Sequence, residues 1–336
     1  MFNRYYQDEL SNLRDLGAEF AKKHPALGPM LASASSDPDV ERILEGTAFL
    51  TGLLREKLDD DFPEIIHELM QIIWPHYLRP MPASTILAFT PKAAMKSSMK
   101  VPAGTYIASV PVEGTQCLFK TCYPVQVHPL RLMKASLHQP PGGLDAVELS
   151  FQLQGLKLSE WHPESLGFHL GGDYVVATEL FYLLKQGLAR IALTAPDGET
   201  CYLQSKHLSN MGFQDQEAII PYPAQSFPGY RLLQEYFLLP EKFLFFRLTG
   251  WEEWQSRGEG SSFTVRLELK ESPRAFTRLK NENFILSATP GINLFSMHAK
   301  PIRLDQRQTE FPVQPDSSRG DHYQVYSVTD VVGIIH

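Results

Sequence analysis

Apolar residues in the first quarter of the chain recur at the spacing of helical turns. Between positions 2 and 23 every third or fourth residue is apolar or small, and mostly polar residues fill the intervals. The repeating positions are Phe2, Tyr6, Leu10, Leu13, Gly17 and Phe20. This spacing predicts an amphipathic helix. His24-Pro25 is expected to end it, because proline disfavours the α conformation in the residue before it.

Two further helices are predicted before residue 80. Asp37-Pro38 fits the N-cap and the first helical position of a second helix. The sequence DFPE at Asp61–Glu64 has the form of a capping box, which predicts the start of a third helix. Apolar residues then continue at helical spacing until Pro75, where this third helix is expected to stop.

Beyond the proline-rich segment Trp74–Pro82, the apolar residues begin to alternate with polar ones. Strict alternation is typical of half-buried strands. It predicts strands over 147–153, 166–170 and 263–269, and 85–89 is strand-like as well. The segments 188–194 and 200–203 are predicted as strands because they flank a turn. Pro196–Glu199 fits a hairpin turn, and short helices are predicted over Ala177–Gln186 and Tyr230–Leu238.

The predicted fold class is α+β, with an N-terminal helical segment followed by mainly antiparallel β domains with short helical insertions. We expect bundle-forming amphipathic helices over 1–80, a first β-rich domain over 81–225 and a second over 226–336. Four aromatic residues in and after the last helix are expected to fill a core: Tyr236, Phe237, Phe243 and Phe245. Val331–His336 is apolar and carries no stop signal, so we expect the chain to be truncated before the end of a longer protein.

Charge is concentrated at the front of the chain. The 31 Lys and Arg against 38 Asp and Glu give a net charge of −7. Residues 1–80 hold 8 basic and 14 acidic side chains, so −6 of that charge lies there. Neither part is basic enough to attract nucleic acid. The first residues, MFNRYYQ, do not form a signal peptide, and apolar runs are far shorter than the ~20 residues of a membrane helix. We therefore expect a cytoplasmic protein without direct membrane insertion.

Motifs that carry enzymatic chemistry are missing from the sequence. There is no phosphate-binding glycine loop, no His-Glu-x-x-His and no Gly-x-Ser-x-Gly. Cys117, Cys122 and Cys201 provide neither a disulfide framework nor two ligand pairs for zinc. The acids Asp59–Asp61 lack the spacing of a calcium loop. We therefore expect no catalytic, cofactor-binding or metal site and no enzymatic activity.

One alternative function stays open on residue chemistry. Trp251 and Trp254 enclose the carboxylates of Glu252 and Glu253, which resembles the aromatic platforms and paired acids of carbohydrate-binding or glycan-hydrolysing modules. Adjacent residues on a strand point to opposite faces, so these acids would form a pair only in a turn.

Several long segments, in order along the chain, carry a family resemblance. They are FNRYYQDELSNLRDLGAEF at 2–20, DPDVERILEGTAFL at 37–50, LDDDFPEIIHELMQIIWPHYLRP at 58–80, SFPGYRLLQEYFLLPEKFLFF at 226–246 and NFILSATPGINLFSMHAKP at 283–301. Together they resemble the TssF family, also called VasA or ImpG, which supplies a baseplate subunit of the type VI secretion system.

The resemblance implies a structural role without an enzymatic activity, metal or cofactor. It implies a fold similar to the wedge proteins of contractile phage-tail baseplates. It also implies that two TssF copies join one TssG, and that these wedges bind TssK and TssE around the spike hub VgrG. There they start assembly of the contractile, phage tail-like injection system, on the cytoplasmic side of the inner membrane.

The N-terminal helices are the expected protein interface. Three amphipathic helices cannot bury all of their apolar stripes among themselves, so a partner's helices would complete the bundle. We predict that Tyr6, Leu10, Leu13 and Phe20 build a bundle of TssF, a second TssF copy and TssG. The alternative is that these side chains pack inside the protein itself.

Overall fold

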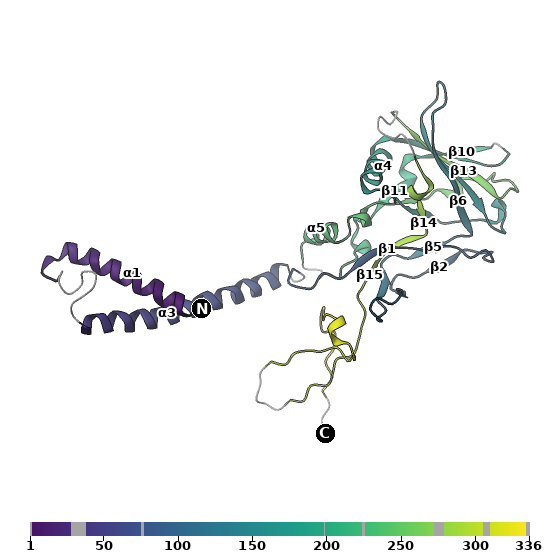
Figure 1. Ribbon diagram of the computed structural model, residues 1–336. Coiled ribbons are helices and arrows are strands. Elements are labelled where there is room, and N and C mark those ends of the chain that lie inside the picture. The colour runs from purple at the N-terminus through teal and green to yellow at the C-terminus, as the bar shows by residue number, and fades with distance from the viewer. Residues whose placement is uncertain are drawn as a thin grey trace. The chain divides into compact units, whose positions relative to one another are not determined.

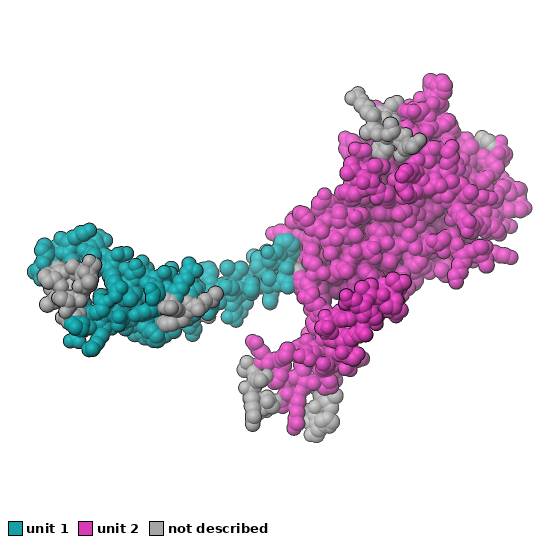
Figure 2. All heavy atoms as spheres, viewed as in Figure 1, with its two compact units in different colours: residues 1–78 teal, residues 79–336 magenta. Residues whose placement is uncertain are grey.

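The protein is represented by a computed structural model, which describes residues 2–27, 38–74, 77–197, 199–223, 226–271, 279–304 and 310–333. It divides into two compact units, Met1–Leu78 and Arg79–His336, coloured teal and magenta in Figure 2. The predicted cap at Asp37, the predicted stop at Pro75 and the turn residue Gly198 lie outside the described residues.

The first unit is a pair of helices. Helix α1 spans Phe2–Lys23, a short 3-10 turn (η1) covers Pro25–Leu27, and α3 spans Pro38–Ile73 (Figure 1). Arg14, in the second half of α1, pairs with Glu41 near the start of α3. Glu9, nearer the start of α1, pairs with Arg55 further along α3. The two helices are therefore antiparallel.

The prediction of separate second and third helices is wrong, because α3 runs unbroken through Pro63. Proline removes one backbone hydrogen bond and typically costs about 3 kcal/mol inside a helix. Good helix formers stand on both sides of it, among them Leu58, Glu64 and Leu69. A local capping-box pattern cannot distinguish a helix start from a helix that continues through a proline.

The second unit is built from antiparallel sheets, which confirms the predicted α+β class. One sheet has the order β1 (Ser84–Ala88), β15 (Ala288–Ile292), β4 (Leu118–Thr121), β3 (Tyr106–Ala108). The largest has the order β10 (Thr200–Gln204), β9 (Leu188–Thr194), β13 (Ser262–Leu269), β7 (Ala146–Leu153), β6 (Leu130–His138). A third has the order β11 (Leu208–Met211), β12 (Phe245–Leu248), β8 (Leu166–His169), β14 (Ile285–Leu286). Strands β2 (Met99–Val101) and β5 (Val125–Val127) form a separate pair.

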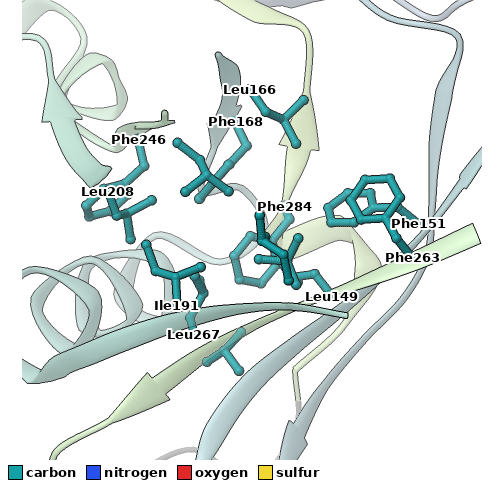
Figure 3. Packing of buried hydrophobic residues seen from close by; sticks show 14 of the residues in the cluster. Leu149, Phe151, Leu166, Phe168, Ile191, Leu208, Phe246, Phe263, Leu267 and Phe284 are labelled. Carbon is teal, nitrogen blue, oxygen red and sulfur yellow. The ribbon is translucent and has the colours of Figure 1, made fainter. Parts of the chain in front are cut away.

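The main core lies between the five-stranded sheet and the β11-β12-β8-β14 sheet. Figure 3 shows Leu149 and Phe263 of the first sheet and Phe168 and Phe246 of the second, which are buried members of the same hydrophobic cluster. The rings of Phe151 and Phe263 stack with centroids 5.1 Å apart. Alternating strand residues thus meet in one apolar layer, as in other packed sheets.

Two helices accompany the sheets close to their predicted positions: α4 spans Tyr174–Gly187 and α5 spans Pro228–Leu238. Strands from both sides of residue 225 share sheets, since β13 pairs with β7 and β9, and β15 pairs with β1 and β4. This differs from the expectation of two β-rich domains, 81–225 and 226–336.

Candidate protein interface

The two helices of the first unit meet along a narrow seam. Leu10 of α1 is only 8% exposed, and Ala48 and Gly52 of α3 are buried. A Cβ atom added to Gly52 would lie 3.2 Å from the backbone nitrogen of Tyr6. The small residues on α3 therefore let the two backbones approach closely.

The four predicted interface residues take different positions relative to this seam. Tyr6 and Leu13 are half-buried and Leu10 is buried, whereas Phe20 is exposed and its ring lies 4.4 Å from that of His24. Leu10 thus has the internal position of the alternative interpretation. The assignment of the four residues to a contact between subunits stays a prediction.

A larger apolar surface lies on the second half of α3. Seven large apolar side chains there are exposed: Leu58, Phe62, Ile65, Ile66, Leu69, Ile72 and Ile73. We call these residues the α3 stripe. Phe62 is 66% exposed and Ile72 is 74% exposed. Leu58, Phe62, Ile65, Leu69 and Ile72 follow a spacing of four and three, which is the heptad pattern of helices that pack side by side.

Helix α1 is too short to cover the α3 stripe. Tyr5, near the start of α1, hydrogen-bonds Asp59, and this bond is the main cause that raises the pKa of the tyrosine. Helix α3 continues from there to Ile73, and its 36 residues exceed the 22 of α1. At 1.5 Å per residue, the difference is about 20 Å of helix. The stripe therefore offers a seam without a helical partner in the described part of the first unit.

Acidic side chains flank this seam. At 100° per residue, Asp59 and Glu68 lie at the sides of the stripe, whereas Asp60 and Glu64 lie on the opposite face of α3; all four are exposed. Residues 1–80 as a whole carry −6. Rim charges of this kind mainly affect the association rate and the choice of partner.

The sequence predicted that apolar stripes of the N-terminal helices meet a partner, but the residues that it singled out lie on α1 and not in the α3 stripe. The signal of the stripe is visible as apolar residues at heptad spacing from 58 to 72, but the predicted break at Pro63 divided it between two helices.

The structure does not support the alternative of a carbohydrate-binding or glycan-hydrolysing module, because the two tryptophans are not exposed. Trp251 and Trp254 are buried, at 0% and 2% exposure, and both pack against Phe263. Glu252 and Glu253 are exposed in a short 3-10 turn, as the turn interpretation expected. No aromatic groove beside paired carboxylates results from this arrangement.

Other candidate chemistry stays dispersed in the described part of the chain. No group of three histidine, cysteine or carboxylate side chains there could hold a metal ion. Cys117, Cys122 and Cys201 are free thiols of intermediate burial. In the same residues, no helix has both the length and the apolar character needed to cross a membrane.

Comparisons with known proteins agree with the family resemblance. The family model for the type VI secretion system protein TssF matches residues 1–335. The type VI secretion system component TssF1 of Pseudomonas aeruginosa is 32% identical over 352 aligned residues, which cover 98% of this chain and 57% of that protein. A solved structure of a TssK-TssF-TssG baseplate subcomplex contains a chain that matches with a TM-score of 0.74 and 31% identity, over 86% of this chain and 55% of its own length. The chain thus spans less than two thirds of the relatives that it matches.

Proposed function

Because the chain belongs to the TssF family of type VI secretion systems, we propose that it is a structural wedge component of the secretion baseplate. Its work is assembly rather than catalysis. The α3 stripe, together with Phe20 and the half-buried Tyr6 and Leu13 of α1, packs against helices of TssG and of a second copy of the chain, in a ratio of two copies to one TssG.

The family's further partners complete the proposal. The similar solved structure contains TssK and TssG beside TssF, which supports both as partners of this chain. TssE and the spike hub VgrG are proposed as further neighbours in the baseplate. The assembly works on the cytoplasmic side of the inner membrane, where it starts the contractile tail.

The observation that carries the proposal is the exposure of the α3 stripe. Full burial of one large apolar side chain contributes roughly 1.5–3 kcal/mol. The seven stripe residues are about half to three-quarters exposed, so their burial by a partner would contribute on the order of 10 kcal/mol. This is enough to offset much of the estimated 4–15 kcal/mol that association costs.

Co-expression with TssG tests this role of the stripe. The double variant Leu69→Asp and Ile72→Asp places two carboxylates in the proposed seam, where burial without a partner is costly. We expect co-purification with TssG to fall at least tenfold. Both side chains are exposed, so the fold of the chain itself should be retained.

The matched control is Gln71→Asp, which adds a carboxylate to the same turn on the opposite, exposed face of α3. It should co-purify with TssG like the unaltered chain. Equal recovery of TssG with the double variant and with the control would overturn the proposed interface.

A further inference from the structure

Helix α5 has its charged side inside and its aromatic side outside (Figure 1 shows α5 in the second unit). Arg231 and Glu235 are fully buried, at 0% exposure. Leu233 and Phe237 lie on the opposite side and are exposed, Phe237 to 75%. An ordinary surface helix has the reverse arrangement, with its apolar stripe towards the core.

Hydrogen bonds fix α5 in this rotation. One carboxylate oxygen of Glu235 accepts from the backbone nitrogens of Ile219 and Ile220, at 2.7 and 3.1 Å. The other accepts from Arg231 at 3.1 Å and from the buried Lys242. Rotating α5 to bury its aromatic side would break these bonds and leave buried charges uncompensated, which is strongly destabilising.

Further contacts secure the two cations. Lys242 also donates to the backbone carbonyl of Glu217 at 3.1 Å. Arg231 reaches Asp215 at 3.3 Å, and its guanidinium lies 4.9 Å from the ring centroid of Tyr222. The outward aromatic side is therefore a fixed feature of the second unit.

The aromatic surface extends beyond the helix. The ring of Tyr236 lies 5.8 Å from that of Phe237 and 6.3 Å from that of Phe243. The ring centroids of Phe243 and Phe213 lie 4.9 Å apart. Tyr174, at the start of α4, hydrogen-bonds Tyr236. We call Leu233, Tyr236, Phe237, Phe213 and Tyr174 the α5 surface; all five are exposed. Contiguous exposed apolar patches of this kind mark interaction sites.

The exposed charges of the three segments that form the α5 surface are acidic, and an exposed cation on the adjoining α4, Lys185, hydrogen-bonds Asn210. In the described segments 173–175, 213–217 and 227–243, the charged side chains that reach solvent are Asp173, Asp215 and Glu241. The cations of these segments, Arg231 and Lys242, are buried. A basic partner is therefore favoured. A second copy of this chain would bring the same acids to the contact, and its α3 stripe is flanked by acids as well.

We propose that the α5 surface docks a basic amphipathic helix of another protein chain. Tyr230, Leu233 and Phe237 follow one side of α5 at spacings of three and four, which is the ridge pattern against which a second helix packs. Lysine or arginine residues at the edges of the docked helix would face Asp173, Asp215 and Glu241. The proposal concerns the second unit alone and does not depend on the role of the α3 stripe.

Two synthetic helices test the proposal on the whole chain: a 14-residue amphipathic peptide of leucine and lysine, and its counterpart of leucine and glutamate. The readout is hydrogen exchange of the backbone amides in residues 226–243, because it reports on this surface separately from the α3 stripe. We expect saturable protection by the leucine-lysine helix and none by the leucine-glutamate helix. Leu233→Ser with Phe237→Ser should weaken that protection at least tenfold.

The matched control is Val110→Ser with Val112→Ser, which removes two exposed apolar side chains elsewhere in the second unit and should leave the protection unchanged. Three results would overturn the proposal: no protection of 226–243, equal protection by both peptides, or unaltered affinity of the Leu233/Phe237 variant. If 226–243 instead becomes protected as the chain's own concentration rises, the occupant is a second copy and not a basic helix. Unchanged exchange elsewhere in the variants verifies that they fold.

Discussion

At the scale of single residues, the carboxylate of Glu235 orients a whole helix. It accepts hydrogen bonds from two backbone amides and forms ion pairs with two cations, and the carboxylate is fully buried. Its spacing of four from Arg231 is the spacing of an ordinary exposed ion pair on a helix. The sequence therefore predicted Tyr236 and Phe237 in the core. That prediction is wrong for both, and only Phe245 of the four expected residues is fully buried.

His169 makes the second unit sensitive to acid. The ring is buried at the end of β8, its Nε2 lies 3.1 Å from the carbonyl oxygen of Glu241, and burial lowers its pKa from 6.5 to about 4. The unfolded chain thus binds a proton between pH 6.5 and 4 that the folded chain does not. The folded state is therefore most stable, with respect to this group, above pH 6.5. It loses stability as the pH falls towards 4, because protonation of the ring favours the unfolded chain. We expect a loss of about 3 kcal/mol in the free energy of unfolding over this interval.

Chemical unfolding at a series of pH values measures this effect. His169→Gln removes the titrating group, so the free energy of unfolding should change less between pH 6.5 and 4 than in the unaltered chain. His298→Gln, at an exposed position, serves as the control and should retain the full dependence. Identical pH dependence in the unaltered chain and His169→Gln would contradict this account of the buried ring.

At the scale of elements, the seam between α1 and α3 depends on one glycine. A Cβ atom on Gly52 would lie 3.2–3.4 Å from backbone atoms of Tyr5 and Tyr6, whereas one on Gly46 would meet nothing within 4 Å. Gly46→Ala should stabilise the helix by up to about 1 kcal/mol through helix propensity. Gly52→Ala gives the same gain in helix propensity, but overpacking against α1 should lower the stability of the helix pair by about 1–3 kcal/mol.

Hydrogen exchange of the α1 amides reports the free energy of opening this helix pair. We predict protection in the order Gly46→Ala, unaltered chain, Gly52→Ala. The reverse order for the two variants would show that the helices are not held by this close approach.

Strands were easier to predict from the sequence than helix limits or helix faces. Alternation in 263–269 predicted β13 almost to the residue, because Phe263, Val265 and Leu267 are buried while the residues between them are not. The hairpin turn at 196–199 likewise located β9 at 188–194. Pro63 was misread, since a proline within a helix has the local pattern of a helix start. The outward side of α5 depends on Glu217 and Lys242, which come from other segments, so no local period could reveal it.

At the scale of the whole molecule, both units carry an apolar surface with acidic side chains around it. The α3 stripe follows a heptad pattern on a long helix, and the α5 surface is held outward by buried ions. Monomeric proteins rarely expose such contiguous apolar surface. Such surfaces are typical of a protein that binds other chains, in agreement with its membership of the TssF family.

The most direct test of the central claim, assembly as a baseplate wedge, is the mass of the complex that this chain forms with co-expressed TssG. Size-exclusion chromatography with light scattering should give two copies of the chain for each TssG. The Leu69→Asp and Ile72→Asp variant should elute apart from TssG, and Gln71→Asp should not. Separate elution of the unaltered chain and TssG would contradict the proposal that residues 1–336 assemble into a wedge.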